Sequence, residues 1–211
     1  SVFMLLVSAL YLGFSWNKYR EAASSEAITL AQSLESMLHS EHITALSGDS
    51  SDLQKAEYNM MKNNLMQLVR NNNKIRFAYI MAQKNGNIIF LLDSESPESP
   101  DYSVPGQIYG EADNYTKESF RSEKTILTDP SSDRWGTWVS ALVPIKDANG
   151  STIAVFGLDY PADDWNTLIW EHMVPDIMIV VSIFMSLIAL LNSRFQSFKP
   201  RELRNKLALD E

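Results

Sequence analysis

Two apolar strands joined by a short turn constrain the fold of this chain most strongly. Residues 137–145 and 152–159 are rich in β-branched and other apolar residues, and residues 147–150 lie between them. The pair Asn149-Gly150 is typical of a tight hairpin turn, because both residue types tolerate positive φ angles. The sequence therefore predicts a β-hairpin.

The second strand of this hairpin carries one acidic residue on an apolar face. Side chains alternate along a strand, so Val155, Gly157 and Asp159 share one face, and Phe156 and Leu158 share the other. Because glycine has no side chain, Gly157 predicts space for a small group beside the Asp159 carboxylate.

Composition excludes several classes of protein. An apolar content of 45% is enough to build the core of one ordinary domain. The formal net charge of −8 provides no basic surface for phosphates, so we expect no nucleic-acid partner. The chain has no cysteine, which excludes disulfides and thiolate metal sites. We expect neither a bound metal nor a cofactor.

Apolar runs near both ends predict two membrane helices. We assign residues 1–16 to a first span whose start is truncated, and residues 173–192 to a second. About 20 residues at 1.5 Å each cross a hydrocarbon core of roughly 30 Å. A signal peptide is the alternative for the first run, and a buried core helix for the second.

The two spans divide the rest of the chain. Residues 193–211 are basic and are predicted to be cytoplasmic by the positive-inside tendency. Residues 17–172 then form an extracytoplasmic domain, and the protein is expected in the cell membrane with two spans.

The pattern of this domain is helical first and then β-rich. Residues 17–46 and 53–69 repeat apolar residues every three or four positions, which predicts two amphipathic helices. Later come strands at 76–82, 88–92 and 125–128, a loop at 93–110, a short helix at 115–121, a turn at 129–132 and then the hairpin.

Together these elements predict an α+β fold with a five-stranded antiparallel sheet. The long N-terminal amphipathic helix and the second helix are expected to cover one face of the sheet. The loop and the short helix are left to cover the other face, where we expect a ligand cavity.

The run from Thr128 to Trp165 carries a resemblance to a known family. It reads TDPSSDRWGTWVSALVPIKDANGSTIAVFGLDYPADDW and resembles the second half of the Cache (PDC, PAS-like) extracytoplasmic sensor domains of prokaryotic receptors. The resemblance is strongest over residues 125–165, and the order of helices and strands extends it over 17–172.

This resemblance implies a function. Such domains lie between two membrane helices of histidine kinases, diguanylate cyclases and chemoreceptors, bind small molecules beneath their loops, and dimerise through the first helix. It therefore implies a PAS-like sensing module, a homodimer, a signal relayed through the membrane helices, and a cytoplasmic output region beyond Glu211.

The candidate ligand-binding residues follow from the resemblance and from side-chain chemistry. The amino-acid-binding branch of the family uses an Arg, aromatic residues and the Asp of the last strand, which corresponds to Asp159. Arg134 offers a planar fork for a carboxylate, and Asp159 an acceptor for an ammonium group. The possible aromatic walls are Trp135, Trp138, Tyr109 and Tyr115.

Several alternatives remain open at the level of the sequence. Arg134 could instead pair with Asp129 or Asp133, Asp159 could accept a hydrogen bond in a turn, and the tryptophans could belong to the core. The ligand could be an amino acid, a small organic acid or an amine.

We predict that the chain is not itself an enzyme. Its three histidines do not form an HExxH motif, and no nucleophile motif or phosphate-binding loop is present. The alternatives to a sensor are a structural dimerisation stalk without a ligand and a membrane-tethered enzyme.

Overall fold

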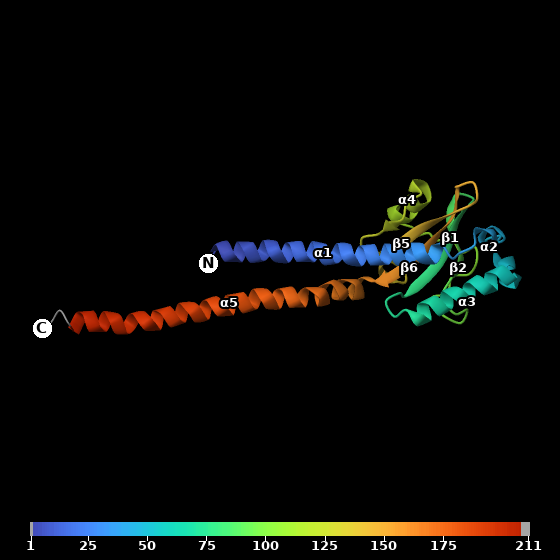
Figure 1. The fold of residues 1–211 in the computed structure, drawn as a ribbon. Coiled ribbons are helices and arrows are strands. Elements are labelled where there is room, and N and C mark those ends of the chain that lie inside the picture. Colours follow the sequence, from blue (N-terminus) through green and yellow to red (C-terminus); the bar gives the residue numbers. More distant parts are fainter. Residues whose placement is uncertain (1, 208–211) are drawn as a thin grey trace. The chain divides into compact units, whose positions relative to one another are not determined.

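The computed structural model describes the backbone of residues 2–207 and the side chains of residues 2–194. The chain forms two compact units, Glu21–Leu168 in one and Ser1–Arg20 with Ile169–Glu211 in the other. Figure 1 traces the chain from α1 to α5. The predicted domain boundaries at 16/17, 172/173 and 192/193 stay a prediction, and the basic side chains beyond Arg194 lie outside the described residues.

Five α-helices and one 3₁₀ helix are present in the described part of the chain. Their bounds are α1 Val2–Glu35, α2 Ser40–Thr44, η1 Ser50–Gln54, α3 Ala56–Asn71, α4 Asn114–Ser122 and α5 Ala162–Leu207.

The first amphipathic helix is shorter than predicted, since α1 ends at Glu35 and not at residue 46. The hydroxyl groups of Ser33 and Ser36 donate to the carbonyls of Thr29 and Ser33, each at 2.7 Å. Serine side chains that bond to nearby backbone groups compete with the helical pattern. A separate short helix, α2, therefore covers the remaining predicted residues.

All six strands belong to one antiparallel sheet. They are β1 Phe77–Lys84, β2 Asn87–Asp93, β3 Ile126–Leu127, β4 Ser131–Asp133, β5 Gly136–Lys146 and β6 Thr152–Pro161. The sheet order is β2-β1-β6-β5-β3, and β4 pairs with β5 beside this path.

The prediction of five strands was therefore one short. Residues 131–133 were predicted to form part of a turn, but they pair with Trp138, Thr137 and Gly136 in a tight hairpin. Gly136 permits this turn because its φ is +155°, a backbone conformation that side chains disfavour.

The two predicted Asn-Gly turns differ. Asn85 and Gly86 have φ angles of 52° and 80°, as predicted for a tight hairpin. In the later turn Gly150 has a φ of 84°, but Asn149 is not among the residues with positive φ. The Asp147 carboxylate holds that turn instead, because its Oδ1 accepts from the backbone N–H groups of Asn149 and Ser151, both at 2.9 Å.

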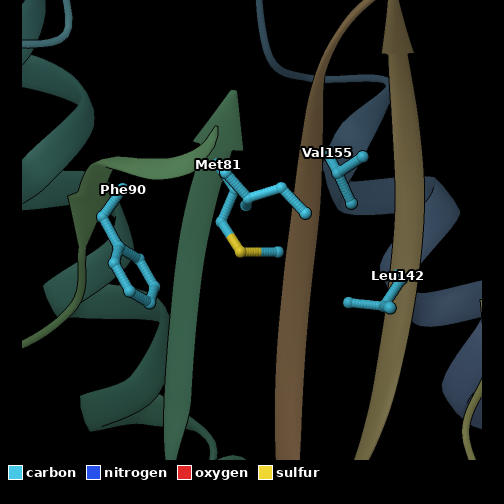
Figure 2. Close-up of a cluster of buried hydrophobic side chains, with 5 residues drawn as sticks. Met81, Phe90, Leu142 and Val155 are labelled. Atoms are coloured by element: carbon cyan, nitrogen blue, oxygen red, sulfur yellow. The ribbon is translucent and has the colours of Figure 1, made fainter. Parts of the chain in front are cut away.

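One face of the sheet carries an apolar cluster of Met81, Ile88, Phe90, Leu142 and Val155. Figure 2 shows four of these side chains projecting from neighbouring strands. Tyr109, Ala112, Phe120 and Trp135 pack against this cluster from the loop before α4, from α4 and from the β4–β5 turn. The prediction that the loop and the short helix cover this face is confirmed.

The opposite face is also buried. Ile80, Phe156 and Leu158 are at most 1% exposed there. Helix α3 packs against β1 and β2, and its buried residues include Tyr58, Met61 and Leu65.

The loop before α4 is fastened to the outer edge of β2. The N–H groups of Gly106 and Tyr109 donate to the carbonyls of Phe90 and Ile88 at 2.8 Å, and the N–H of Phe90 donates to Gln107 at 3.0 Å. These bonds pair the exposed edge of the sheet and position the loop next to the face that carries Asp159.

The space predicted beside Asp159 at Gly157 is filled by the protein itself. Gly157 pairs with Tyr79 on β1, and a Cβ atom at residue 157 would lie 2.2 Å from Cε2 of the Tyr79 ring. Glycine at this position therefore leaves room for the Tyr79 ring beside the carboxylate.

The second compact unit contains the apolar ends of α1 and α5. Within the described residues, Ala162–Arg194 is the one helical stretch long and apolar enough to cross a membrane. The predicted N-terminal span does not meet this criterion. Its apolar run, residues 2–16, is interrupted by Ser8, Gly13 and Ser15 and is followed directly by Asn17 and Lys18.

Side chains of α1 and α5 contact each other within this unit. The Tyr11 hydroxyl donates to Asp176 Oδ1 at 3.0 Å. The rings of Trp16 and Trp170 lie 5.3 Å apart, and those of Tyr19 and His172 lie 5.8 Å apart.

Replacing Gly157 by Ala should destabilise the domain. The new methyl group would displace the Tyr79 ring, and overpacking of this kind costs about 1–3 kcal/mol. Chemical denaturation of the full chain in detergent measures the difference. Gly110→Ala is the control, since no heavy atom lies within 4 Å of a Cβ at residue 110. Equal stability of the two variants would contradict the close packing of Tyr79 on Gly157.

Candidate functional site

A small cavity lies on the face of the sheet that carries Asp159. Its volume is about 30 Å³, which is room for about two water-sized groups. The lining combines four carboxylates, one hydroxyl and five aromatic rings: Asp93, Asp101, Asp133, Asp159, Ser103, Phe77, Tyr79, Phe90, Tyr109 and Trp135.

Asp159 is a buried carboxylate in this lining. It is 6% exposed, and its Oδ1 accepts hydrogen bonds from Ser140 Oγ at 2.6 Å and Tyr79 Oη at 2.9 Å. Burial raises the pKa of Asp159 to about 7, against the lowering effect of these two hydroxyl donors. Both donors bind the same oxygen, so among residues 2–194 no side chain or backbone group donates to Oδ2.

Asp133 organises the turn beside this cavity. Its Oδ1 accepts from the backbone N–H groups of Trp135 and Gly136 at 2.9 and 3.2 Å, and from Trp138 Nε1 at 3.1 Å. The Tyr109 hydroxyl donates to Oδ2 at 3.1 Å. The Asp133 carboxylate therefore accepts four hydrogen bonds, all from neutral donors, and no protein cation compensates its charge among the described residues. That charge contributes to the raised pKa of Asp159.

Protein cations bind the other two carboxylates. Lys62 Nζ lies 2.5 Å from Asp93 Oδ1, and Arg76 Nη2 lies 2.9 Å from Asp101 Oδ2. Ser103 also donates its backbone N–H to Asp93 Oδ2 at 2.6 Å. Burial raises the pKa of Asp93 and lowers that of Lys62.

Aromatic rings lie beside the Asp159 and Asp133 carboxylates. The Phe90 ring lies 5.8 Å from Tyr79, 5.3 Å from Tyr109 and 5.7 Å from Trp135 between ring centroids. Burial raises the pKa of the Tyr79 and Tyr109 hydroxyls, so both stay protonated and remain donors. Ring faces next to a carboxylate favour a cation over an anion.

The four carboxylates of the cavity therefore differ in whether a protein cation compensates their charge. Asp93 and Asp101 are each paired with a cation, whereas no described lysine or arginine forms an ion pair with Asp133 or Asp159. A ligand with an ammonium group would supply the missing charge, and Asp159 Oδ2 would accept its N–H bond. In the described part of the chain no three His, Cys, Asp or Glu side chains are grouped to hold a metal ion.

The structure brings three of the six predicted site residues together. Asp159, Trp135 and Tyr109 line the cavity. Trp138 lies close by but not in the lining, with its Nε1 on Asp133 and its ring 5.1 Å from Phe77.

The other two predicted residues lie outside the cavity lining. Tyr115 is on α4, and its hydroxyl donates to Asp129 Oδ2 at 2.9 Å. Arg134 is exposed, its guanidinium lies 4.0 Å above the Trp135 ring, and its backbone N–H donates to Glu111. The alternative ion pair of Arg134 with Asp133 is not among the salt bridges of the described residues.

Sequence reasoning missed several lining residues. Phe77 and Tyr79 share a face of β1 by their alternation, and pairing β1 with β6 would have placed them beside Asp159. The sequence contains no comparable signal for Asp93, because its partner Lys62 comes from a helix 31 residues earlier.

Comparison with family models and with curated protein sequences gives no match. Solved structures do match. The ligand-binding domain of the Campylobacter jejuni chemoreceptor Tlp3, in complex with L-valine, has a TM-score of 0.55 and 17% identity. The match covers 78% of this chain and 62% of that domain, so this chain spans about three fifths of its length.

A second structure is the ligand-binding domain of the Pseudomonas aeruginosa amino acid chemoreceptor PctC in complex with GABA. Its TM-score is 0.51 at 12% identity, over 80% of this chain and 68% of that one. Both matches confirm the predicted architecture of a long N-terminal helix and an antiparallel sheet. This chain has the fold of the ligand-binding sensor domains of bacterial chemoreceptors.

Proposed function

We propose that this chain is the extracytoplasmic sensing module of a transmembrane receptor and that it binds a small organic compound through an ammonium group. One observation carries this proposal: Asp159 is buried in an aromatic cavity, and its Oδ2 lacks a protein donor among the described residues. The fold shared with chemoreceptor sensor domains supports it.

The charge of the cavity favours one of the ligand classes that the sequence left open. An organic acid would place its carboxylate among four acidic side chains, which costs free energy unless protein cations compensate. An amine, or an amino acid bound through its ammonium group, meets complementary charge. The bound ammonium compounds in the Tlp3 and PctC complexes, L-valine and GABA, are consistent with this choice.

The proposal includes a size requirement. The cavity holds about two water-sized groups, enough for an ammonium head group but not for a larger body. Trp135 and Tyr109 line the cavity. Trp135 lies in a turn and Tyr109 in a loop, and such segments move more readily than strands. A longer ligand would displace them and so couple binding to a change in the loop.

For the whole receptor we propose two membrane spans, residues 1–16 and 173–192, with the C-terminus in the cytoplasm, and a homodimer formed through α1. The exposed apolar side chains of α1 before Asn17 support the first span, as do its contacts with α5 within the same unit. In this arrangement ligand binding biases the packing of the membrane helices and so reaches an output region. The chain itself would carry no catalytic activity.

A thermal-shift screen of the full chain in detergent tests the ligand class. We expect small amines or amino acids to raise the unfolding temperature, and organic acids without an amino group not to. A ligand at 100 times its Kd adds about 2.7 kcal/mol of stability. Asp159→Asn should abolish the shift, and Arg134→Ala, which alters an exposed side chain, should keep it.

Two results would count against this proposal. Hits among acids alone would contradict the ammonium site. The absence of any hit in a broad screen would favour the structural stalk.

Binding should depend on pH through Asp159. Because the pKa of Asp159 is about 7, the carboxyl is protonated in more acidic solution and cannot pair with an ammonium group. Below pH 7 the affinity should fall by up to about tenfold per pH unit, since each unit corresponds to about 1.4 kcal/mol. Above pH 8 the affinity should be constant while the amine remains charged.

Isothermal titration calorimetry in buffers of different protonation enthalpy checks this dependence. At pH 6.5 binding should release a proton, and Asp159→Asn should remove that release together with the pH dependence. An affinity that is flat from pH 5 to 8 would show that Asp159 does not meet the charged group of the ligand.

The relay through the membrane helices can be tested by disulfide formation, because the chain contains no cysteine. We expect Trp16→Cys with Trp170→Cys to cross-link in nanodiscs, since their rings lie 5.3 Å apart. An amine from the screen should change the rate, about fivefold for a coupling near 1 kcal/mol.

Phe14→Cys with Trp170→Cys is the control pair, because Phe14 is an exposed residue of α1 and is not among the described residues whose rings contact α5. A cross-linking rate that ignores a saturating ligand would contradict the relay.

A further inference from the structure

The cavity has a second anionic position that the protein occupies itself. Asp93 lines the same cavity as Asp159, and Lys62 of α3 extends its ammonium group to within 2.5 Å of the Asp93 carboxylate. Both residues are 5% exposed. A buried lysine loses its hydration, which explains why burial lowers its pKa and why the carboxylate partner is needed to keep it there.

The groups that bind the Lys62 ammonium group are of the same kinds as those around Asp159. Its Nζ lies 4.3 Å above the Tyr102 ring centroid, and the Tyr102 hydroxyl is 3.0 Å from that of Tyr58. A carboxylate and an aromatic face thus hold an ammonium group at Asp93. At Asp159 a carboxylate and aromatic rings are also present, without a protein cation.

The sheet sets the distance between the two positions. Asp93 pairs with Tyr79, and Asp159 pairs with Phe77, so the two acidic residues lie on strands that flank β1. Two strand spacings and a two-residue offset place their Cα atoms on the order of 12 Å apart. A short aliphatic diamine could bring one ammonium group to each carboxylate.

We infer that Lys62 determines the charge specificity of the cavity: it fills the anionic position at Asp93 and so restricts the ligand to one ammonium group. This inference rests on the proposed function. Removal of the Lys62 charge would expose a second anionic position and convert the cavity into a site for diamines.

The test compares two probes of matched length, pentylamine and 1,5-diaminopentane, on the full chain in detergent. Wild-type protein should bind pentylamine at least as tightly as the diamine. Lys62→Met, which keeps the length of the side chain and removes its charge, should bind the diamine at least tenfold more tightly than pentylamine. Calorimetry gives both dissociation constants.

Two control variants separate this role from general electrostatics. Lys62→Met combined with Asp93→Asn removes the second anionic position and should restore the wild-type ratio of affinities. Lys74→Met removes a lysine that pairs with Glu26 at 50% exposure, and it should leave the ratio unchanged. A diamine preference that also appears in either control would overturn the inference.

A folding defect of Lys62→Met would not prevent the test. In that case the readout is recovery of a cooperative unfolding transition, and 1,5-diaminopentane should restore it where pentylamine does not. No recovery with the diamine would overturn the inference.

The remaining outcomes separate the inference from the proposed function. A folded Lys62→Met variant with the wild-type ratio means that Lys62 is structural, while the amine site stands. If neither amine binds wild-type protein or Lys62→Met, the inference and the ammonium site fail together.

Discussion

The burial of the Asp159 carboxylate on one face of the sheet is the constraint on which the site depends. Moving a charged group from water into a protein interior costs several kcal/mol of free energy unless the group is hydrogen-bonded, paired or neutralised. Here two hydroxyl donors share one oxygen, and the remaining cost appears as a pKa of about 7. Among the described residues, no lysine or arginine forms an ion pair with Asp159.

The residues around Asp159 come from several elements of the fold. Gly157 lets the Tyr79 ring lie close beside the carboxylate, and Ser140 reaches it from the neighbouring strand β5. The loop before α4 is fixed to the edge of β2 and brings Tyr109 to the cavity, and the β4–β5 turn brings Trp135 to it. At the far end Lys62 and Arg76 neutralise Asp93 and Asp101. One cavity thus contains two carboxylates that are paired with protein cations and two that are not. Under the proposed function, this difference would orient the ligand.

The sequence predicted what is local and missed what depends on register. The two-residue period placed Gly157 and Asp159 on one face correctly, because alternation follows from backbone geometry alone. Tyr79 was visible in its strand, but its position beside Asp159 depends on how β1 pairs with β6, which periodicity does not determine. The ion pair of Lys62 with Asp93 joins a helix to the end of a strand, and nothing in either segment indicates the other.

Arg134 illustrates the opposite error of reasoning from residue type. It stands in a conspicuous motif next to two tryptophans, and its chemistry suits a carboxylate ligand. The tight β4–β5 turn, held by Asp133, directs its side chain to the surface over Trp135 instead. Asp133 itself, which the sequence offered only as a partner for Arg134, is the residue that shapes the turn.

The most direct measurement is a crystal structure of the domain with the amine that stabilises it most. We predict that the ligand nitrogen lies within hydrogen-bonding distance of Asp159 Oδ2, that Lys62 is still bound to Asp93, and that Trp135 is displaced. A ligand bound elsewhere, such as the surface pocket lined by Ile43, Gly48 and Ile89, or one that turns a carboxylate toward Asp159, would contradict it.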